Sequence, residues 1–334
     1  MKRLCIAAWG AGRMGRGIAH TFAFAGHKVL VFDSKPRDAQ ADANLKAECL
    51  AEIRANLLGL VQLQVMTEPQ VEQTLASIEY VSFEQATKRL SEVSVVFEGV
   101  PEVLEAKQAA FEFLSQHVAA DCIVASTTST MLSTELAAWV KLPERFLNAH
   151  WLNPAYLIPL VEVSPHEGTS QAVVAQLNDL LKSIGKKPVQ CKPAPGFIVP
   201  RLQALVMNEA ARMIEQGIAT PEAIDEAIRF GFGPRYAAMG VVEFIDVGGL
   251  DILYHASKYL AQTTKDNRYA APDIVNRYMA EGRLGLKSGA GFYDYRDTDV
   301  PAYRQEVMTR QVALLKQLSL VPVFNAGVEE NEEK

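Results

Sequence analysis

The sequence predicts an α/β fold, with an amino-terminal doubly wound sheet, an inserted helical hairpin and a following all-α domain. Two observations predict it. In the first part of the chain, short apolar runs typical of buried strands alternate with segments of helical periodicity. After the proline- and glycine-containing segment 192–196, no strand pattern recurs and apolar residues keep helical spacing. We therefore expect a sheet domain over 1–192, a helical domain over 193–300, and a terminal helix with an acidic tail over 301–334.

A glycine-rich loop follows the first predicted strand. The strand pattern over 4–9 leads into Gly10-Ala11-Gly12-Arg13-Met14-Gly15, which opens a helix, and a second strand over 28–32 comes next. This is the context of a dinucleotide-binding, Rossmann-type domain, because the glycines let the backbone approach a pyrophosphate at the positive end of the helix. The candidate cofactor-binding residues of the loop are Gly10, Gly12, Arg13, Met14 and Gly15. The alternative is a glycine-rich turn without a ligand.

The acidic residue Asp33 ends the second predicted strand. Its carboxylate is placed to accept hydrogen bonds from the adenosine ribose and to repel a 2′-phosphate, which favours NAD over NADP. Lys35 and Arg37 lie close by in the sequence and weaken that exclusion.

Polar residues follow the later strands of the sheet domain. A helical hairpin over 36–76 and a short strand over 78–81 precede a buried strand over 93–97. Glu102 follows that strand, and Ser129 follows the next one, over 122–125. Because ligands bind at the carboxyl edge of an open parallel sheet, these residues are expected to face one cleft together with His150. Each could also be a loop cap or a surface residue.

The chain is organised around the stretch from Arg145 to Val163. A strand over 146–149 exits into His150, and a strand over 160–163 carries Glu162 in an apolar run. A buried carboxylate needs a partner, and His150 is the nearest candidate. A carboxylate bonded to one imidazole nitrogen makes the other a base suited to a hydroxyl proton. The alternative is a structural pair without chemistry.

The second half of the chain reads as helices. A last strand over about 187–191 is followed by predicted helices over 197–216, from 220 to about 230, through 260, over 273–282 and over 302–318. Its high apolar content predicts a dimer interface, although a compact core would give the same pattern.

Composition excludes several classes of partner. Over 334 residues the formal charge is −6, with 49% hydrophobic residues, which argues against nucleic acid or an anionic membrane surface. The first nine residues read as a strand and not as a signal peptide, and no apolar run is long enough to span a membrane. Cys5, Cys49, Cys122 and Cys191 lack metal-ligand spacing, which predicts reduced thiols in a cytoplasmic protein and no metal site.

Five motifs resemble the 3-hydroxyacyl-CoA dehydrogenase family of fatty acid metabolism over about residues 3 to 296. They are EGVPEVLEAK (98–107), ASTTST (125–130), AHWLNPAYLIPLVEV (149–163), PGFIVPRLQ (195–203) and GLKSGAGFYDY (285–295). The resemblance implies a Rossmann-type domain and a helical domain that binds substrate and dimerises. It also implies that the cofactor is NAD and that the partner is a small hydroxy acid or an acyl-CoA.

The resemblance also implies residue roles. His150 takes the proton of the 3-hydroxyl, Glu162 orients His150, and Ser129 binds the substrate oxygen near the cofactor. The remaining positions where the family contacts NAD are Glu102, Lys107, Asn153 and Lys287.

Two departures point within the family to the branch that acts on free hydroxy acids. Pro200 stands where the family usually has an asparagine that contacts substrate, and Ile158-Pro159 replaces a Met-Lys pair. The stretch is closer to the L-gulonate 3-dehydrogenase (λ-crystallin) and carnitine dehydrogenase types. Arg235 is then a candidate counter-ion for a substrate carboxylate, or else a surface residue at a helix end.

We therefore expect an NAD-dependent dehydrogenase that oxidises the 3-hydroxyl of a short 3-hydroxy acid. The first alternative is an L-3-hydroxyacyl-CoA dehydrogenase of the 3-hydroxybutyryl-CoA type. The second is a non-catalytic, crystallin-like or sensor protein that binds NAD, and the intact set of Ser129, His150 and Glu162 disfavours it.

Overall fold

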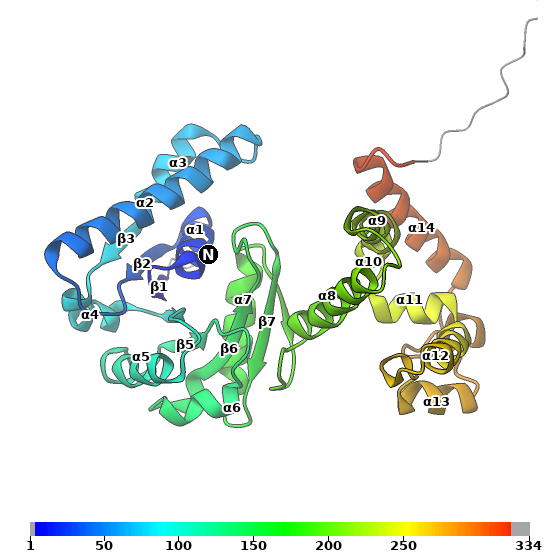
Figure 1. Cartoon of the computed structure of the whole chain (residues 1–334). Helices are drawn as coiled ribbons and strands as arrows, with labels where there is room; N and C mark the ends of the chain where they lie inside the picture. The colour runs from blue at the N-terminus through cyan, green and yellow to red at the C-terminus, as the bar shows by residue number, and fades with distance from the viewer. Residues whose placement is uncertain (1–3, 322–334) are drawn as a thin grey trace, which may run out of the picture. The chain divides into compact units, whose positions relative to one another are not determined.

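The computed structural model describes residues 4–321 (Figure 1). The chain divides into two compact units, Met1–Met207 and Asn208–Lys334. This division falls inside a helix, α8 (Val199–Glu215), whose amino end belongs to the first unit and hydrogen-bonds Glu162 there. The domain boundary expected after residue 192 stays a prediction.

The first unit is built on one eight-stranded sheet of order β3-β2-β1-β4-β5-β6-β7-β8. All neighbouring strands pair in parallel except β6 and β7, which are antiparallel. The doubly wound α/β prediction is therefore confirmed, with one antiparallel pair added. The strands are β1 (Cys5–Trp9), β2 (Lys28–Phe32), β3 (Ile78–Val81), β4 (Val95–Glu98), β5 (Ile123–Ser126), β6 (Phe146–Trp151), β7 (Leu160–Pro165) and β8 (Lys187–Gln190).

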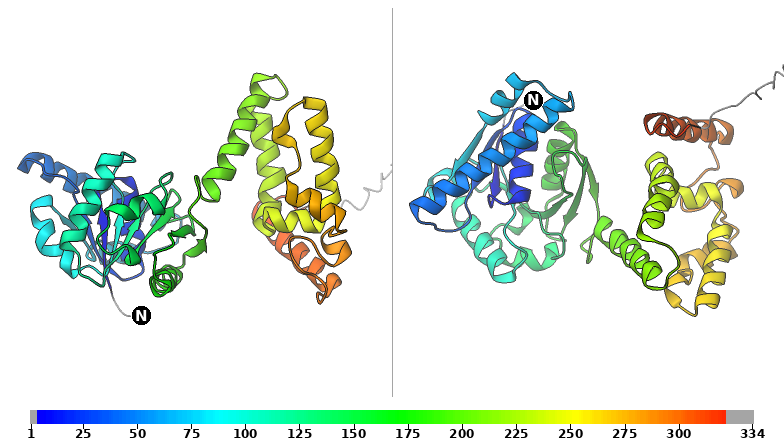
Figure 2. Two further views of the ribbon diagram at one scale, coloured as in Figure 1. Left: turned by 90° about the horizontal axis from the view of Figure 1, so that it is seen from below. Right: turned by 45° about the horizontal axis from the view of Figure 1, so that its top comes forward.

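Helices cover both faces of this sheet, as the views in Figure 2 show. One apolar core joins the sheet to helices α1, α2, α3 and α7, through side chains such as Phe22, Ile53 and Leu177. The other joins the opposite face to α4, α5 and α6, through side chains such as Phe111 and Leu136. The helices are α1 (Arg13–Phe24), α2 (Ala39–Gln62), α3 (Glu68–Leu75), α4 (Phe83–Arg89), α5 (Leu104–His117), α6 (Ser133–Leu136) and α7 (Gln171–Ser183).

Helix α7 is absent from the elements predicted above, although the hairpin α2–α3 matches its prediction. The sheet topology explains why a helix is needed at this position. Strands β7 and β8 are parallel, and a parallel pair requires a crossover connection, which is usually a helix. Val173, Leu177 and Leu181 give α7 the apolar face that packs on the sheet.

Helix α8 begins at Val199 and not at the predicted residue 197, because Phe197 has a positive φ of +45°. Pro200 lies in the first turn, where a backbone N–H has no helical partner and its loss costs nothing. Proline at the position of the family asparagine is thus compatible with the helix.

The second unit is helical, as predicted. Over the residues described beyond Asn208 it contains isolated β-bridges near Ala290 but no strand. A π-helical segment, Ile228–Phe232, interrupts the helix that was expected to run to about residue 230. Besides the end of α8, the helices are α9 (Pro221–Ala227), α10 (Gly233–Ala238), α11 (Val241–Gly248), α12 (Leu250–Thr264), α13 (Asp273–Ala280) and α14 (Val300–Gln317).

Two expectations concern the chain's end and membranes. The predicted acidic tail lies outside the described residues. In the part of the chain that is described, no helix combines the length and apolarity needed to cross a membrane.

Candidate active site

The glycine loop leaves room for a ligand at the start of α1. Gly10 has φ +116°, a value that side chains disfavour, and a Cβ on Gly15 would lie 2.0 Å from the Gly10 carbonyl oxygen. Gly12 is the N-cap of α1, and a Cβ there would meet nothing within 4 Å. Two glycines are thus required by the turn itself, whereas Gly12 borders open space at the positive end of a helix.

A pocket of about 920 Å³ lies beside this loop. Its walls include Gly10, Gly12, Met14, Asp33, Glu102, Lys107 and Ser129. Asp33 is 2% exposed, and the Arg37 Nε donates a hydrogen bond to its Oδ2 at 2.5 Å. The pocket therefore brings together the glycine loop and the acidic residue of β2, and this arrangement fits a dinucleotide.

His150 and Glu162 face each other across the antiparallel pair β6–β7. They are register partners, and His150 Nδ1 lies 2.7 Å from Glu162 Oε2. Both side chains are buried. His150 therefore lies inside β6 and not at its exit, because pairing with β7 extends the strand through Trp151.

The second oxygen of Glu162 is occupied by the start of α8. Glu162 Oε1 accepts hydrogen bonds from the backbone N–H groups of Ile198 and Val199, each at 2.8 Å. These donors and the positive end of the helix stabilise the negative charge of the carboxylate. Phe197 stacks on the imidazole of His150, with ring centroids 5.4 Å apart. No residue pattern predicts the bonds from Ile198 and Val199 to Glu162, because every residue except proline carries the same backbone N–H donor.

Ser129 completes the arrangement on the other side of the imidazole. Its Oγ lies 3.1 Å from His150 Nε2. The loop that carries it is held by Glu102, whose carboxylate accepts from the Ser129 N–H at 2.7 Å and from the Thr128 hydroxyl at 2.8 Å. Glu102, expected at the cofactor, thus lines the pocket and also fixes the serine loop.

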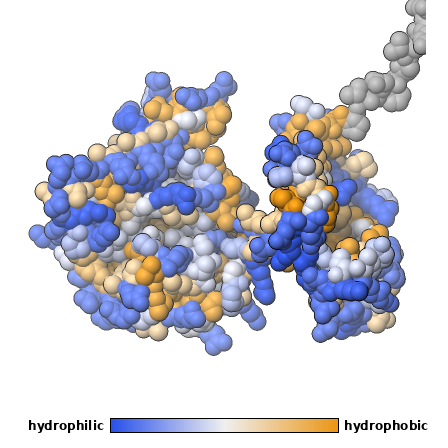
Figure 3. Space-filling view, in the orientation of Figure 1, coloured by the Kyte–Doolittle hydropathy of each residue, from blue (hydrophilic) through white to orange (hydrophobic). Residues whose placement is uncertain are grey.

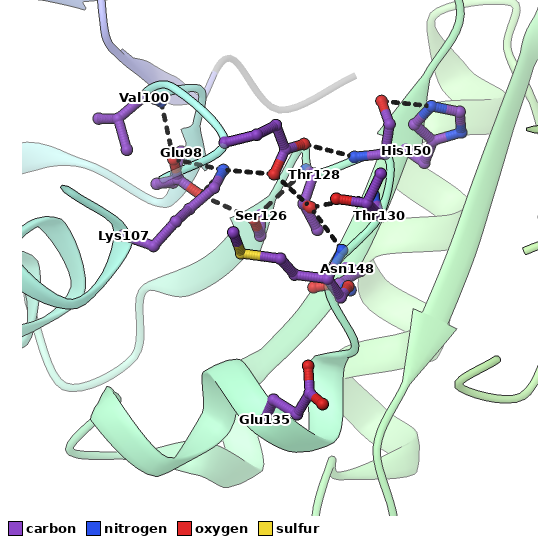
Figure 4. Close-up of polar contacts among 12 residues, drawn as sticks. Glu98, Val100, Lys107, Ser126, Thr128, Thr130, Glu135, Asn148 and His150 are labelled. Atoms are coloured by element: carbon purple, nitrogen blue, oxygen red, sulfur yellow. Dashed lines mark hydrogen bonds and ion pairs between the residues drawn. The ribbon is translucent and has the colours of Figure 1, made fainter. Parts of the chain in front are cut away.

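A buried ion pair joins Lys107, which lines the pocket, to Glu98 (Figure 4). Lys107 Nζ lies 3.0 Å from both carboxylate oxygens of Glu98, and the two side chains are 1% and 0% exposed. Glu98 also accepts from the Ser126 hydroxyl and the Val100 N–H. Burial raises the pKa of the Glu98 carboxyl, and these donors oppose that shift. Sequence reasoning missed Glu98, although a carboxylate ending a buried strand is the same signal that singled out Glu162.

The remaining candidates lie in different places. Asn153 is exposed, precedes a cis peptide bond to Pro154, and lines a second pocket of about 250 Å³ together with Arg13. Lys287 and Arg235 belong to the second unit. Lys287 Nζ lies 2.6 Å from Asp251 Oδ1. The Arg235 guanidinium lies 5.7 Å from the ring centroid of Phe244.

Comparison with known proteins identifies the family. The model of the 3-hydroxyacyl-CoA dehydrogenase NAD binding domain matches residues 5–194, and that of the 3-hydroxyacyl-CoA dehydrogenase C-terminal domain matches residues 196–295. The chain belongs to the 3-hydroxyacyl-CoA dehydrogenase family. It is therefore an NAD-dependent oxidoreductase that acts on CH–OH groups, as the sequence predicts.

Three relatives illustrate the range of the family. A probable 3-hydroxybutyryl-CoA dehydrogenase of Bacillus subtilis is 32% identical, covering 89% of this chain and 98% of that protein. The 5-formyl-3-hydroxy-2-methylpyridine 4-carboxylate 5-dehydrogenase of Mesorhizobium japonicum is 30% identical, covering 92% and 96%. The solved structure of a 3-hydroxyacyl-CoA dehydrogenase of Archaeoglobus fulgidus has a TM-score of 0.74 at 28% identity, covering 96% of this chain and 100% of that chain.

Proposed function

We propose that this dehydrogenase oxidises the 3-hydroxyl group of a short 3-hydroxy acid, with His150 as the base. One observation carries the proposal, namely the continuous contact from Ser129 through His150 to Glu162. A purely structural histidine pair would not need a hydroxyl on its second nitrogen. Production of NADH on addition of 3-hydroxy acids tests this activity directly.

The two contacts of the His150 imidazole indicate which of its nitrogens carries the proton. An ionised carboxylate can only accept, so the imidazole donates from Nδ1 to Glu162. Nε2 is then the acceptor, and it faces Ser129. This nitrogen takes the substrate hydroxyl proton, and Glu162 stabilises the imidazolium that results. Ser129 donates to the substrate oxygen and so orients the hydroxyl toward Nε2.

NAD would be held by the glycine loop Gly10–Gly15 and by Asp33, with Asn153, Lys287 and Glu102 as further contacts proposed from the resemblance. When bound, NAD supplies the acceptor for the hydride that leaves C3 of the substrate. The protein residues orient the substrate oxygen and accept its proton.

We expect NAD to bind roughly 100-fold more tightly than NADP, because like charges face each other if a 2′-phosphate lies beside Asp33. Titration of the protein with NADH and NADPH measures both Kd values. Asp33→Ser should bring the Kd values of NADH and NADPH much closer together. The substitution removes the carboxylate and frees Arg37, whose Nε donates to Asp33 Oδ2 in the wild type. Equal affinities in the wild type would mean that Arg37 or Lys35 captures the phosphate.

The charge pattern of the α2–α3 hairpin supports a free acid over a CoA ester. The segment 37–76 carries three basic residues, and two of them are already paired: Arg37 with Asp33 and Arg54 with Glu72. On α2, Glu48 and Glu52 bind Arg16. Since CoA carries several phosphate charges, a hairpin with so few available cations attracts it weakly.

Arg235 is the proposed counter-ion for the substrate carboxylate. It is exposed in the last turn of α10, and among residues 4–321 no carboxylate lies within ion-pair distance of its guanidinium. An arginine fork suits a carboxylate because it donates two parallel hydrogen bonds. The relative from Mesorhizobium japonicum, named for a pyridine carboxylate, supports a free-acid substrate in this family.

A second candidate function is oxidation of an L-3-hydroxyacyl-CoA ester. The observation that favours it is the naming of other relatives, among them the 3-hydroxybutyryl-CoA dehydrogenase of Bradyrhizobium diazoefficiens, 35% identical. The two candidates share the base and the cofactor and differ in whether the substrate ends in a free carboxylate or in a CoA thioester.

We expect a higher kcat/KM for free 3-hydroxy acids than for their CoA esters. Arg235→Ala should raise KM for the free acids by about 10- to 100-fold, which corresponds to about 1.5–3 kcal/mol for a hydrogen bond to a charged group. The same change should leave KM for the esters near the wild-type value. A wild-type enzyme that strongly prefers the esters would establish the second candidate instead.

We also propose that the protein is a homodimer. Large apolar side chains are exposed along α8 and the segments after it, and Figure 3 shows orange surface on the helical unit. Contiguous exposed apolar surface is typical of protein–protein contacts. The exposed residues include Leu202, Leu205, Met207, Ile214, Ile218, Phe230 and Phe232. Light scattering or sedimentation measures the mass in solution.

A further inference from the structure

A buried lysine outside the catalytic contacts touches the connection between β6 and β7. Lys186 precedes β8 and is only 5% exposed. Its Nζ donates to the carbonyl oxygens of Ala155, at 2.6 Å, and Ile158, at 2.8 Å. It also lies 5.6 Å from the ring centroid of Trp151. In the described chain no carboxylate lies within ion-pair distance of it, so the two carbonyls and the ring are its partners.

The two carbonyls belong to a compact turn. The Pro154 carbonyl oxygen accepts from the N–H groups of Leu157 and Ile158, each at 3.0 Å. The Lys186 ammonium donates to two carbonyls of the same turn, Ala155 and Ile158, and so links the residues on either side of Tyr156 and Leu157. Burying an ammonium without an anion is unfavourable, and lysine is rarely found buried in this way. The two hydrogen bonds to carbonyl oxygens offset part of this cost and fix the position of the turn.

The turn is packed against α1, the helix that starts at the glycine loop. Ala155 lies against Gly17, where an added Cβ would be 3.0 Å from the Ala155 Cβ. Tyr156 stacks on His20 with ring centroids 4.4 Å apart. The Thr21 hydroxyl donates to the Ala155 carbonyl at 3.3 Å. Lys186 therefore holds a turn that is seated on α1 and that begins next to Asn153.

We propose that Lys186 is a positioning residue for the cofactor, since it holds the 153–158 turn on α1 and so places Asn153 beside the amino end of that helix. The observation that supports this placement is the pocket of about 250 Å³ that Arg13 and Asn153 line together. The inference rests on the proposed cofactor contact of Asn153. Lys186 itself touches neither His150 nor Glu162, so its loss acts on binding and leaves the proton transfer intact.

The test compares Lys186→Met with Lys187→Met. Methionine retains length and apolar volume but removes the donors, and the neighbouring Lys187 is exposed and serves as the matched control. In the protein without ligand, amide exchange at Leu157 and Ile158 should become roughly 10-fold faster in Lys186→Met and stay unchanged in Lys187→Met. The Kd for NADH should rise about 10-fold, the effect of one lost charged hydrogen bond, with kcat at saturation nearly kept.

The ammonium can also be followed by the fluorescence of Trp151. Burial lowers the pKa of Lys186 to about 8, so wild-type emission should change near pH 8 and this step should be missing in Lys186→Met. His20 does not titrate in this range, because burial, together with the Lys186 charge, lowers its pKa to about 4. The folded protein releases the Lys186 proton at a lower pH than the unfolded chain does, so between pH 8 and 10.5 the unfolded chain binds more protons. The contribution of Lys186 to the free energy of unfolding therefore rises with pH in this range. A merely structural lysine would change stability without changing Kd.

Three outcomes separate the proposals. If Lys186→Met keeps the wild-type Kd for NADH, the inference is wrong, whether or not exchange at Leu157 and Ile158 becomes faster. If that variant does not fold, Lys186→Gln, which keeps two neutral donors, should give intermediate exchange and intermediate Kd, and wild-type values in it would also overturn the inference. A wild-type protein that binds NADH but oxidises no hydroxy acid contradicts the proposed function alone, because exchange and NADH binding do not depend on turnover.

Discussion

His150→Gln is expected to lower kcat by about 100- to 10,000-fold, while the Kd for NADH stays near the wild-type value. General-base catalysis contributes a factor of this size. Glutamine still fills the site next to Phe197 but has no nitrogen that can accept a proton. Steady-state turnover with a 3-hydroxy acid and fluorescence titration with NADH measure the two quantities separately.

Glu162→Gln is the matched comparison for that experiment. The amide oxygen can still accept from Ile198 and Val199, as Glu162 Oε1 does now. The amide nitrogen, however, would then face the N–H at His150 Nδ1, so two donors oppose each other. We expect a smaller loss of kcat than in His150→Gln and a shifted pH profile. Wild-type turnover in His150→Gln would exclude His150 as the base.

Lys107→Met is expected to lower the free energy of unfolding by about 3–5 kcal/mol, because it leaves the buried Glu98 carboxylate without its cation. Domains of ordinary size have only about 5–15 kcal/mol in total, so the variant is near the limit of folding. Urea denaturation followed by circular dichroism measures the change. The ion pair is the reason for the size of the effect, since Glu98 is fully buried and Lys107 nearly so.

The double variant Lys107→Met with Glu98→Gln separates the ion pair from cofactor binding. A neutral amide can still bond Ser126 and Val100, and no charge remains buried, so much of the lost stability should return. If Lys107 acts instead through the cofactor, the single variant would weaken NADH binding and leave the unfolding free energy near the wild-type value. That result would contradict the structural role.

Local sequence signals predict the parts of the site that depend on one segment. The GxGxxG pattern needs only a strand before it and a helix after it, and the structure has β1 and α1 in those places. His150 and Glu162 are linked by a hairpin whose two strands each show an apolar pattern, so their pairing follows from short-range geometry. The helical second unit is likewise visible in its periodicity.

Contacts between distant segments could not be predicted in the same way. The Glu162 bonds to Ile198 and Val199 use backbone N–H groups more than thirty residues away, and any sequence could supply such donors. The pairing of Lys107 with Glu98 depends on how α5 packs on β4, and no local sequence pattern encodes that packing. Helix α7 was missed because the need for it arises from a parallel strand pair.

The sequence by itself determined the fold class, the family and the residue types suited to binding NAD and accepting a proton, because these depend on periodicity and on spacing within short segments. Only the tertiary structure decided which groups those residues bond. The Glu162 carboxylate accepts from the first backbone N–H groups of α8, and the Glu102 carboxylate accepts from the loop that carries Ser129. The Lys186 ammonium donates to the turn after Asn153. The physical reason is that burial makes each polar group depend on partners within about 3 Å, and folding alone brings such partners together.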